Sequence, residues 1–425
     1  MSMKFSLNYW GRFAKFCTMA SQQWAIGESV LDVLIGGTSF LDSKEGFKNS
    51  FSGPHSIENF LLAYGYDAED PIEHAELQGN LQEAVRFIKR YFLRPENAEG
   101  LSLEMPKKLN DHLDLRELLR QASMPHSEQR PWACAILKVV HTISHIDRDI
   151  RTHYFTEIQK QIFDRFYRHL NRDEDGRLYF GRTLNDELRV DLVEFQIKPK
   201  KSRDSILMKL LHKPESVAEE LFDRVGIRII TKNRVDAIRV IHFLEQTNVI
   251  VAANIKPSRS RNTLIDTKVF HDVLEQNIIN PGVLTDLLEA VPHPQDRVTE
   301  NRFSSEHYRA IQFTCRQLIK LRNSVADQIR DLKQVSRNMT LDEPLQAVVD
   351  KLDPKTIQKM IRFFYPFEVQ VMDQLSHIEN EKGRSAHVEY KKAQQQTAMI
   401  RVMGSLVQTS LNQNVNQAAK PGPTK

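Results

Sequence analysis

A short basic segment near the middle of the chain has the residue types of a polyphosphate site. Lys201, Ser205 and Lys209 recur every four residues, so on a helix they lie close to one line. Ser202 can cap that helix, and the free N–H groups and dipole at a helix start favour an anion, as do the two ammonium groups. The spacing therefore fits a polyphosphate site, although the segment taken alone favours an ordinary basic amphipathic helix.

Two carboxylates stand at strand-like segments. Asp223 precedes the apolar run 225–231, which carries Arg228 near its start. Glu368 alternates with apolar residues in 367–371. Carboxylate oxygens are the ligands that Mg²⁺ prefers, a carboxylate can accept a hydroxyl proton, and a guanidinium can stack on a base. Each carboxylate could therefore bind a metal ion, and the plain alternatives are a surface salt bridge at Asp223 and an outward-facing polar pair at Glu368 and Gln370.

Three further polar positions accompany these groups. Tyr308 and Gln312 share one face of a strand expected at 308–314, where the tyrosine ring could stack on a base or simply lie half exposed. Gln370 shares a strand face with Glu368. His387 belongs to a helical segment in which Gly383, His387 and Lys391 are again four residues apart.

In their order along the chain, these segments resemble the synthetase domain of the RelA/SpoT family over about residues 195–392. The family pattern runs R-x-K-x-x-x-S-x-x-x-K, D-[LI]-x-[GA]-[ILV]-R, G-Y-x-S-x-H, E-[IV]-Q-[IVL]-R-T and E-x-G-x-x-x-H-x-x-Y-K. The first, second and last pieces match closely. The resemblance implies ATP phosphates at Lys201, Ser205 and Lys209, Mg²⁺ at Asp223, adenine on Arg228, acceptor guanine on Tyr308, the metal or acceptor hydroxyl at Glu368, and nucleotide contacts at Gln312, Gln370 and His387.

The reaction that the resemblance implies is pyrophosphate transfer. The 3′-hydroxyl of GDP or GTP attacks the β-phosphorus of ATP and AMP leaves, in the manner of an alarmone synthetase. The sequence departs from the family at several positions: among them, Pro199 and Met372 replace arginines, His307 replaces a glycine and Gln312 replaces a histidine. Most of these departures surround the acceptor site. Two alternatives therefore stay open: transfer to a tRNA 3′ end, and a degenerate protein that binds nucleotides without turnover.

Hydrophobic periodicity indicates the elements that must position these residues. Residues 1–170 have helical periodicity, and strands and helices alternate after Asn171. We predict an α+β fold, with an all-helical domain at 1–170 and a mixed-sheet, nucleotidyltransferase-like domain at 171–405. A helical insertion at about 316–360 would carry Leu318, Leu321, Val325, Ile329 and Leu332 on one side of its first helix, and a disordered tail would follow at 406–425. The strands expected in the second domain are 178–180, 194–198, 225–231, 248–253, 308–314 and 363–372, and the helices are 203–212, 234–246 and 374–400.

Composition indicates the setting. The 425 residues are 40% hydrophobic and 27% charged, enough for a normal core, and the net charge of +4 argues against a general nucleic-acid coat. The cysteines Cys17, Cys134 and Cys315 have no metal-ligand spacing, which favours a reduced setting. No apolar stretch is long enough to span a bilayer, so we expect a cytoplasmic protein without a membrane partner.

Two other patterns are assigned no function. Residues 171–176 resemble the start of a calcium loop, but Arg182 stands where the loop needs glutamate, so a hairpin turn is predicted. His141, His145 and Asp147 could meet on one helix, but they lack the wider pattern of the family's hydrolase domain. We therefore do not predict alarmone hydrolysis.

Overall fold

The computed structural model describes most of the chain in ten segments. They are residues 55–111, 114–182, 186–198, 201–212, 225–275, 281–292, 308–339, 342–353, 358–382 and 384–410, together with the single residues 33, 36, 39, 41, 42, 47, 51 and 294. Asp223 and Pro199 lie outside the described residues. Among those that are described, no helix is both long and apolar enough to cross a membrane.

The chain divides into two compact units that interleave along the sequence. A helical unit contains Met1–Arg148, Ser202–Ala218 and Lys391–Lys425, and a sheet unit contains Asp149–Lys201 and Glu219–Tyr390. The division does not follow the expected boundary at residue 170. The predicted phosphate helix belongs with the N-terminal helices instead of with the sheet.

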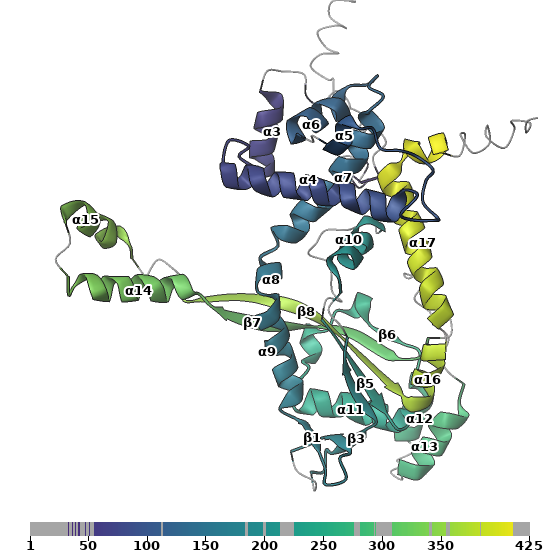
Figure 1. The fold of residues 1–425 in the computed structure, drawn as a ribbon. Helices are drawn as coiled ribbons and strands as arrows, with labels where there is room; N and C mark the ends of the chain where they lie inside the picture. The colour runs from purple at the N-terminus through teal and green to yellow at the C-terminus, as the bar shows by residue number, and fades with distance from the viewer. Residues whose placement is uncertain are drawn as a thin grey trace, which may run out of the picture. The chain divides into compact units, whose positions relative to one another are not determined.

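The helical unit is built around α4 (Pro71–Phe92) and α7 (Arg130–Asp147), which pack against each other and against α6 (Leu115–Ser123) (Figure 1). The unit also holds α3 (Ser56–Tyr64), the short α5 (Lys108–Asp111) and the later part of α17 (Arg384–Met403). Asp70 begins α4 by accepting hydrogen bonds from two backbone N–H groups of the first turn, next to Pro71 at the first helical position. Residues 405–410, where the disordered tail was expected to begin, are helical, and Leu406 is buried, so the tail prediction is wrong for these residues.

Helix α10 (Arg203–His212) is fastened to this helical unit by charge and by apolar packing. The Arg203 guanidinium donates to both oxygens of Glu83, at 2.5 and 3.0 Å, and to both oxygens of Asp147, at 2.5 and 2.8 Å. The same pairs raise the pKa of Arg203 above its ordinary value. Leu207 and Leu211, one and two turns further along the helix, are fully buried, and Arg401 donates to the Leu211 carbonyl at 2.7 Å. Arg203 therefore anchors α10 to the neighbouring helices of the helical unit.

The sheet unit contains two sheets. After α8 (Ile150–His153) and α9 (Phe155–Tyr167), the strands β1 (Leu170–Arg172), β2 (Leu178–Phe180) and β3 (Val190–Leu192) form an antiparallel three-stranded sheet, with the β1–β2 turn at Gly176 in the left-handed region. The larger sheet has the order β4-β5-β8-β7-β6. Its strands are β4 (Glu194–Ile197), β5 (Gly226–Thr231), β6 (Arg261–Asn262), β7 (Ile311–Arg322) and β8 (Met360–Asp373).

Parallel and antiparallel pairs both occur in the larger sheet. β5 and β8 are parallel, and the β4–β5, β7–β8 and β6–β7 pairs are antiparallel. The remaining elements are α11 (Arg234–Gln246), η3 (Ala252–Asn254), η4 (Pro257–Arg259), α12 (Thr267–Glu275), α13 (Pro281–Ala290), α14 (Ser324–Ser336), α15 (Glu343–Lys351) and α16 (Gln374–Lys382). The predicted α+β class with a mixed sheet is confirmed.

The two faces of the larger sheet differ in chemistry because successive side chains of a strand alternate between faces. One face is the core of this unit: Ile227 and Ile229 of β5 and Val369 of β8 are fully buried, together with Ile162 of α9 and Val240 of α11. We call the other side of the central strands the polar face, because Arg228, Gln370 and Glu368 alternate with those core residues. Since α9 and α11 pack against the core face, the functional side chains of the sheet are found on the polar face.

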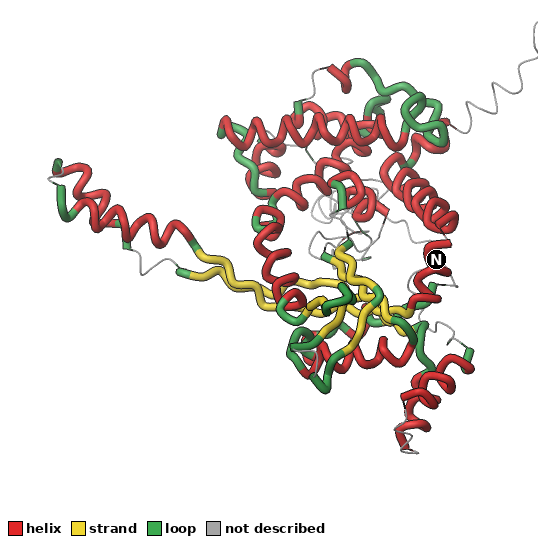
Figure 2. The backbone as a smooth tube through the Cα atoms, turned by 60° about the horizontal axis from the view of Figure 1, so that its bottom comes forward, coloured by secondary structure: helices red, strands yellow, loops and turns green. Residues whose placement is uncertain are grey.

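The N-terminal end of the predicted helical insertion is wrong. β7 continues to Arg322 and pairs residue by residue with β8 back to Met360, so Leu318 and Leu321 lie on a strand instead of a helix. Side chains from Arg316 to Arg322 alternate between exposed and buried, which is a period of two and not of 3.6. Figure 2 shows this two-stranded ribbon leading out to α14 and α15, which form the helical part of the insertion.

Two other predicted elements also differ. No strand forms at 248–253; α11 ends at Gln246, Val249 and Ile250 are buried as a loop, and the single 3₁₀ turn η3 follows. That apolar run is short and stands directly after a helix, so it has no room to pair with a strand. The segment 374–400, expected to be one helix, is helical in α16 and α17, and Gly383 between them lies outside the described residues.

Candidate functional site

Strand register brings four predicted site residues together on the polar face. Arg228 of β5 and Gln312 of β7 each stand opposite Gln370 of β8, on either side of it. Glu368 is two residues earlier on β8 and stands opposite Gly226. Three strands that are far apart in the sequence thus present Arg228, Gln312, Glu368 and Gln370 side by side.

Hydrogen bonds join these side chains and Tyr308 into one chain. The Tyr308 hydroxyl donates to Gln370 Oε1 at 3.0 Å, and Gln370 Nε2 donates to Gln312 Oε1 at 3.1 Å. Gln312 Nε2 in turn donates to Glu368 Oε1. Each amide uses its oxygen as an acceptor and its nitrogen as a donor, so the direction of every bond is fixed by the next. The sequence had indicated each residue separately but not this connection.

Lys198 is a member of the site that the sequence prediction missed. Its Nζ lies 2.5 Å from Glu368 Oε2, and the Glu368 side chain is only 9% exposed. Because Gln312 occupies Oε1 and Lys198 occupies Oε2, both carboxylate oxygens already have partners. The signal was present in the polar–apolar alternation of residues 194–198, which puts Lys198 on the polar side of β4.

Gly226 makes room for this lysine. A Cβ atom on Gly226 would lie 2.6 Å from Lys198 Cδ and 3.1 Å from Cγ, which is closer than a real Cβ atom tolerates. The Lys198 backbone N–H also donates to the Gly226 carbonyl at 2.9 Å. The Lys198 side chain therefore crosses β5 above Gly226, which has no side chain, and reaches Glu368 on the next strand, β8.

Arg228 and Tyr308 form the other end of the polar face. Arg228 Nη1 lies 3.5 Å from Gln196 Oε1 and 3.5 Å from Glu381 Oε1, and its Nε is buried with no hydrogen-bond partner among the described residues. Burial raises the pKa of the Tyr308 hydroxyl, and the nearby Arg228 acts in the opposite direction. Tyr308 therefore remains a neutral donor to Gln370.

The other predicted residues lie elsewhere. Ser205 and Lys209 are on α10 in the helical unit, and Lys201, two residues before α10, belongs to the sheet unit. Ser202 caps the helix as expected, since its Oγ accepts a hydrogen bond from the Ser205 N–H at 3.2 Å. His387 is on α17, in a part whose side chains are not described. The structure thus gathers the predicted acceptor-side residues, while Asp223 lies outside the described segments.

The described residues do not fit a magnesium ion at Glu368. Among them no group of three or more His, Cys, Asp or Glu side chains is placed to hold a metal ion. Glu368 is the one predicted ligand that is described, and an ammonium group already lies against it. A cation there would have to displace Lys198, so we derive no chemical step from a metal bound to Glu368.

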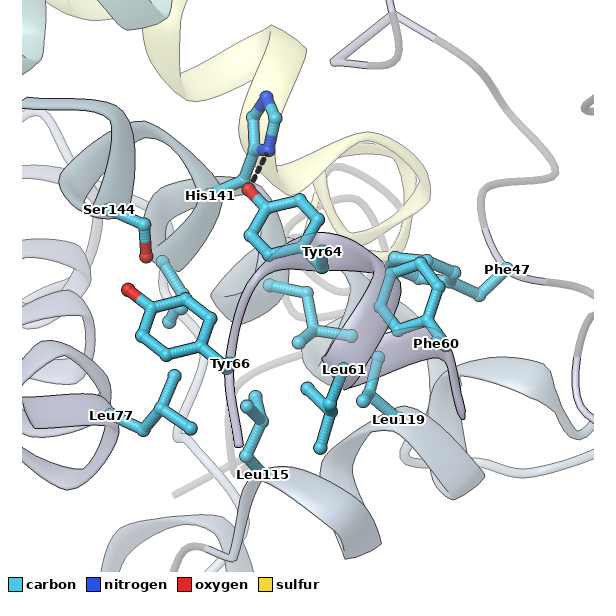
Figure 3. Close-up of a pocket in the computed structure, with 12 residues that line it drawn as sticks. Phe47, Phe60, Leu61, Tyr64, Tyr66, Leu77, Leu115, Leu119, His141 and Ser144 are labelled. Carbon is cyan, nitrogen blue, oxygen red and sulfur yellow. Dashed lines mark hydrogen bonds between the residues drawn. The ribbon is translucent and has the colours of Figure 1, made fainter. Parts of the chain in front are cut away.

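A second candidate site is a cavity of about 170 Å³ in the helical unit. Figure 3 shows Phe60, Leu61, Tyr64 and Tyr66 around it, with the Tyr64 hydroxyl 2.5 Å from His141 Nδ1. Burial raises the pKa of Tyr64 to about 12 and lowers that of His141 to about 4, so both are uncharged at neutral pH. The residues that line the cavity therefore include no charged side chain that could pair with a phosphate.

The buried His141 makes the stability of the helical unit depend on pH. Its pKa is about 4 when folded, against an ordinary value of 6.5, so the unfolded chain takes up the proton first as the pH falls. The contribution of neutral His141 to the free energy of unfolding is fully present above pH 6.5 and is lost as the pH falls towards 4. Between pH 7 and pH 5 we expect a loss of about 2 kcal/mol from this residue.

Chemical denaturation of the wild type and of His141→Gln at the two pH values measures this loss. The variant should lose about 2 kcal/mol less than the wild type between pH 7 and pH 5. His74→Gln, at an exposed position of α4 in the same unit, is the control and should behave like the wild type. An equal pH dependence in all three proteins would contradict the assignment.

Comparison with known proteins adds no relative. No family model matches this chain, and no curated protein sequence matches it.

Proposed function

We propose that the sheet unit is a nucleotidyltransferase-like domain of the RelA/SpoT type and that it transfers pyrophosphate from ATP to the 3′-hydroxyl of GDP or GTP. One observation carries the proposal: Arg228, Tyr308, Gln312, Glu368 and Gln370, chosen from separate sequence segments, lie together on one face of a mixed sheet. An arrangement in which these residues faced opposite sides of the sheet would have removed its basis. The proposal includes a cytoplasmic setting, where both nucleotides occur.

Each residue has a role in this proposal that follows from its chemistry. The Tyr308 ring stacks on the acceptor guanine, and its bond to Gln370 holds it in place. Arg228 has a buried, unpartnered Nε and stacks on the adenine of ATP. Lys201, Ser205 and Lys209 bind the donor phosphates. Glu368 accepts the proton of the attacking hydroxyl, which requires that Lys198 first move away from it.

ATP is expected to arrive with Mg²⁺ on its phosphates, and Asp223 is the residue proposed to receive that ion. A hard cation in this position neutralises the charge of the transferred group. The 3′-oxygen of the acceptor forms a bond to the β-phosphorus, the bond between the α–β bridging oxygen and that phosphorus breaks, and AMP leaves with the oxygen.

A second function is favoured by the same lysine that the sequence prediction missed. Because Lys198 is paired with Glu368, the candidate base is not free to accept a proton. A protein that binds nucleotides on the polar face without turnover fits this pairing. Transfer to the 3′ end of tRNA is the remaining alternative and concerns only the acceptor.

One assay separates the three functions. The full chain is incubated with γ-phosphate-labelled ATP, Mg²⁺ and either GDP, GTP or tRNA, and the labelled product is identified. Label on GDP or GTP supports the proposed reaction, label on tRNA supports the other acceptor, and binding of nucleotide without labelled product supports the regulatory function. Absence of nucleotide binding in titration calorimetry would exclude all three.

Substitution of Tyr308 tests the acceptor site separately from catalysis. We expect Tyr308→Ala to weaken GDP binding by about tenfold or more, because stacking of a base on an aromatic ring is worth about 1–3 kcal/mol. Tyr308→Phe keeps the ring and loses only the bond to Gln370, so it should bind within about twofold of the wild type. Titration calorimetry measures both, and equal losses in the two variants would contradict stacking.

A further inference from the structure

The polar face holds a carboxylate and an ammonium group in a geometry that the sequence resemblance does not account for. Glu368 is buried, and a buried charge without a partner destabilises the folded protein. The group that pairs with this carboxylate therefore has a large effect on the stability of the fold. The resemblance predicts a divalent cation beside this carboxylate. The structure has the Lys198 ammonium there instead, 2.5 Å from Oε2.

We infer that Lys198 is a built-in cation that takes the place of a divalent metal at Glu368 and keeps metal ions away from this carboxylate. Gln312 holds the second oxygen, so the ammonium and the amide together satisfy the group. This inference deepens the proposed function, since it names what neutralises the polar face before a nucleotide binds.

The surrounding sheet fixes where the lysine side chain lies in the nucleotide-free protein. Its backbone N–H donates to the Gly226 carbonyl, and its Cγ and Cδ lie over the space that a Gly226 side chain would fill. Lys198 directly follows β4, whose pairing with β5 fixes where the side chain starts. Its side chain is 27% exposed and that of Glu368 is 9% exposed, so the ion pair is largely withdrawn from solvent.

Thermal unfolding of the nucleotide-free protein in MgCl₂ tests the inference, with NaCl of equal ionic strength as the reference. Removal of the ammonium by Lys198→Met should leave a carboxylate that a divalent cation stabilises. At about 10 mM Mg²⁺ we expect the Tm of Lys198→Met to rise by about 3 °C, and that of the wild type to change by less than about 1 °C. Lys198→Met/Glu368→Gln should lose the response.

Two results would overturn the inference. One is a magnesium response of the wild type that Glu368→Gln abolishes, because a metal would then bind Glu368 despite the lysine. The other is a Lys198→Met variant that responds no more than the wild type. If Lys198→Met does not fold, the comparison of the wild type with Glu368→Gln still decides the matter. Since no nucleotide is present, failure here is distinct from failure of the proposed activity, which the labelled-ATP assay reads.

Discussion

A chain that lacks residues 1–148 is expected to be insoluble, although it retains every described residue of the polar face. The helical unit is discontinuous, so the truncated chain keeps α10 and the later part of α17 without the helices that cover them. Leu207, Leu211, Ala398 and Val402 are at most 2% exposed in the full chain. Each larger apolar side chain costs about 1.5–3 kcal/mol when it returns to water. For the two leucines and the valine this is roughly 5–9 kcal/mol, which is comparable with the whole stability of a typical domain.

The fraction of soluble protein after expression, compared with the full chain, measures this effect. A matched control removes residues from the sheet unit: residues 323–359 are replaced by Asn-Gly, which joins the paired residues Arg322 and Met360 through a two-residue turn. Most apolar side chains of α14 and α15 are exposed, including Val325, Leu332 and Val348, so this deletion should remain soluble. A monomeric 149–425 chain that unfolds cooperatively would refute the interleaved arrangement.

The second large effect is expected at Gly226. Alanine there places a methyl group 2.6 Å from Lys198 Cδ, so the lysine must leave its path to Glu368. Overpacking of this kind typically costs about 1–3 kcal/mol, and we expect about 2 kcal/mol or more because the ion pair is strained as well. Gly79, on α4, has no atom within 4 Å of the added Cβ. Gly79→Ala should therefore stabilise the chain, by about 0.5–1 kcal/mol.

Denaturant unfolding measures the change in the free energy of unfolding, which should fall in Gly226→Ala and rise in Gly79→Ala. The cause at Gly226 is checked in a Lys198→Ala background, where the side chain that clashes is gone. There Gly226→Ala should cost much less than in the wild type, which appears as coupling in a double-mutant cycle. Additive losses would show that the glycine is needed for the strand itself and not for the lysine.

Local patterns in the sequence predicted local elements well. The helices at 203–212 and 234–246 were predicted with the bounds that the structure has, because an N-cap and an apolar stripe mark each. Strand parity correctly separated Glu368 and Gln370 from Val369 and Val371. Alternation with a period of two leaves no freedom about which residues share a face, even when the partner strand is unknown.

Pairings between distant residues could not be predicted in this way. Lys198 and Glu368 meet only because β5 lies between β4 and β8. The order of strands in a sheet cannot be predicted from the residue pattern of any one strand. Arg203 likewise binds Glu83 and Asp147, which precede it by more than fifty residues. The extension of β7 past residue 316 was missed because several apolar residues there also fit a helical stripe.

The order of strands in the larger sheet has a consequence for the newly synthesised chain. β5 pairs with β4 on one edge and with β8 on the other, and β8 is roughly 140 residues later in the chain. While the ribosome is still adding those residues, β5 has an open edge and Ile227 and Ile229 lack much of their cover. Arg228 can meet Gln370 only after β8 has emerged, so the polar face is among the last parts of the molecule to form.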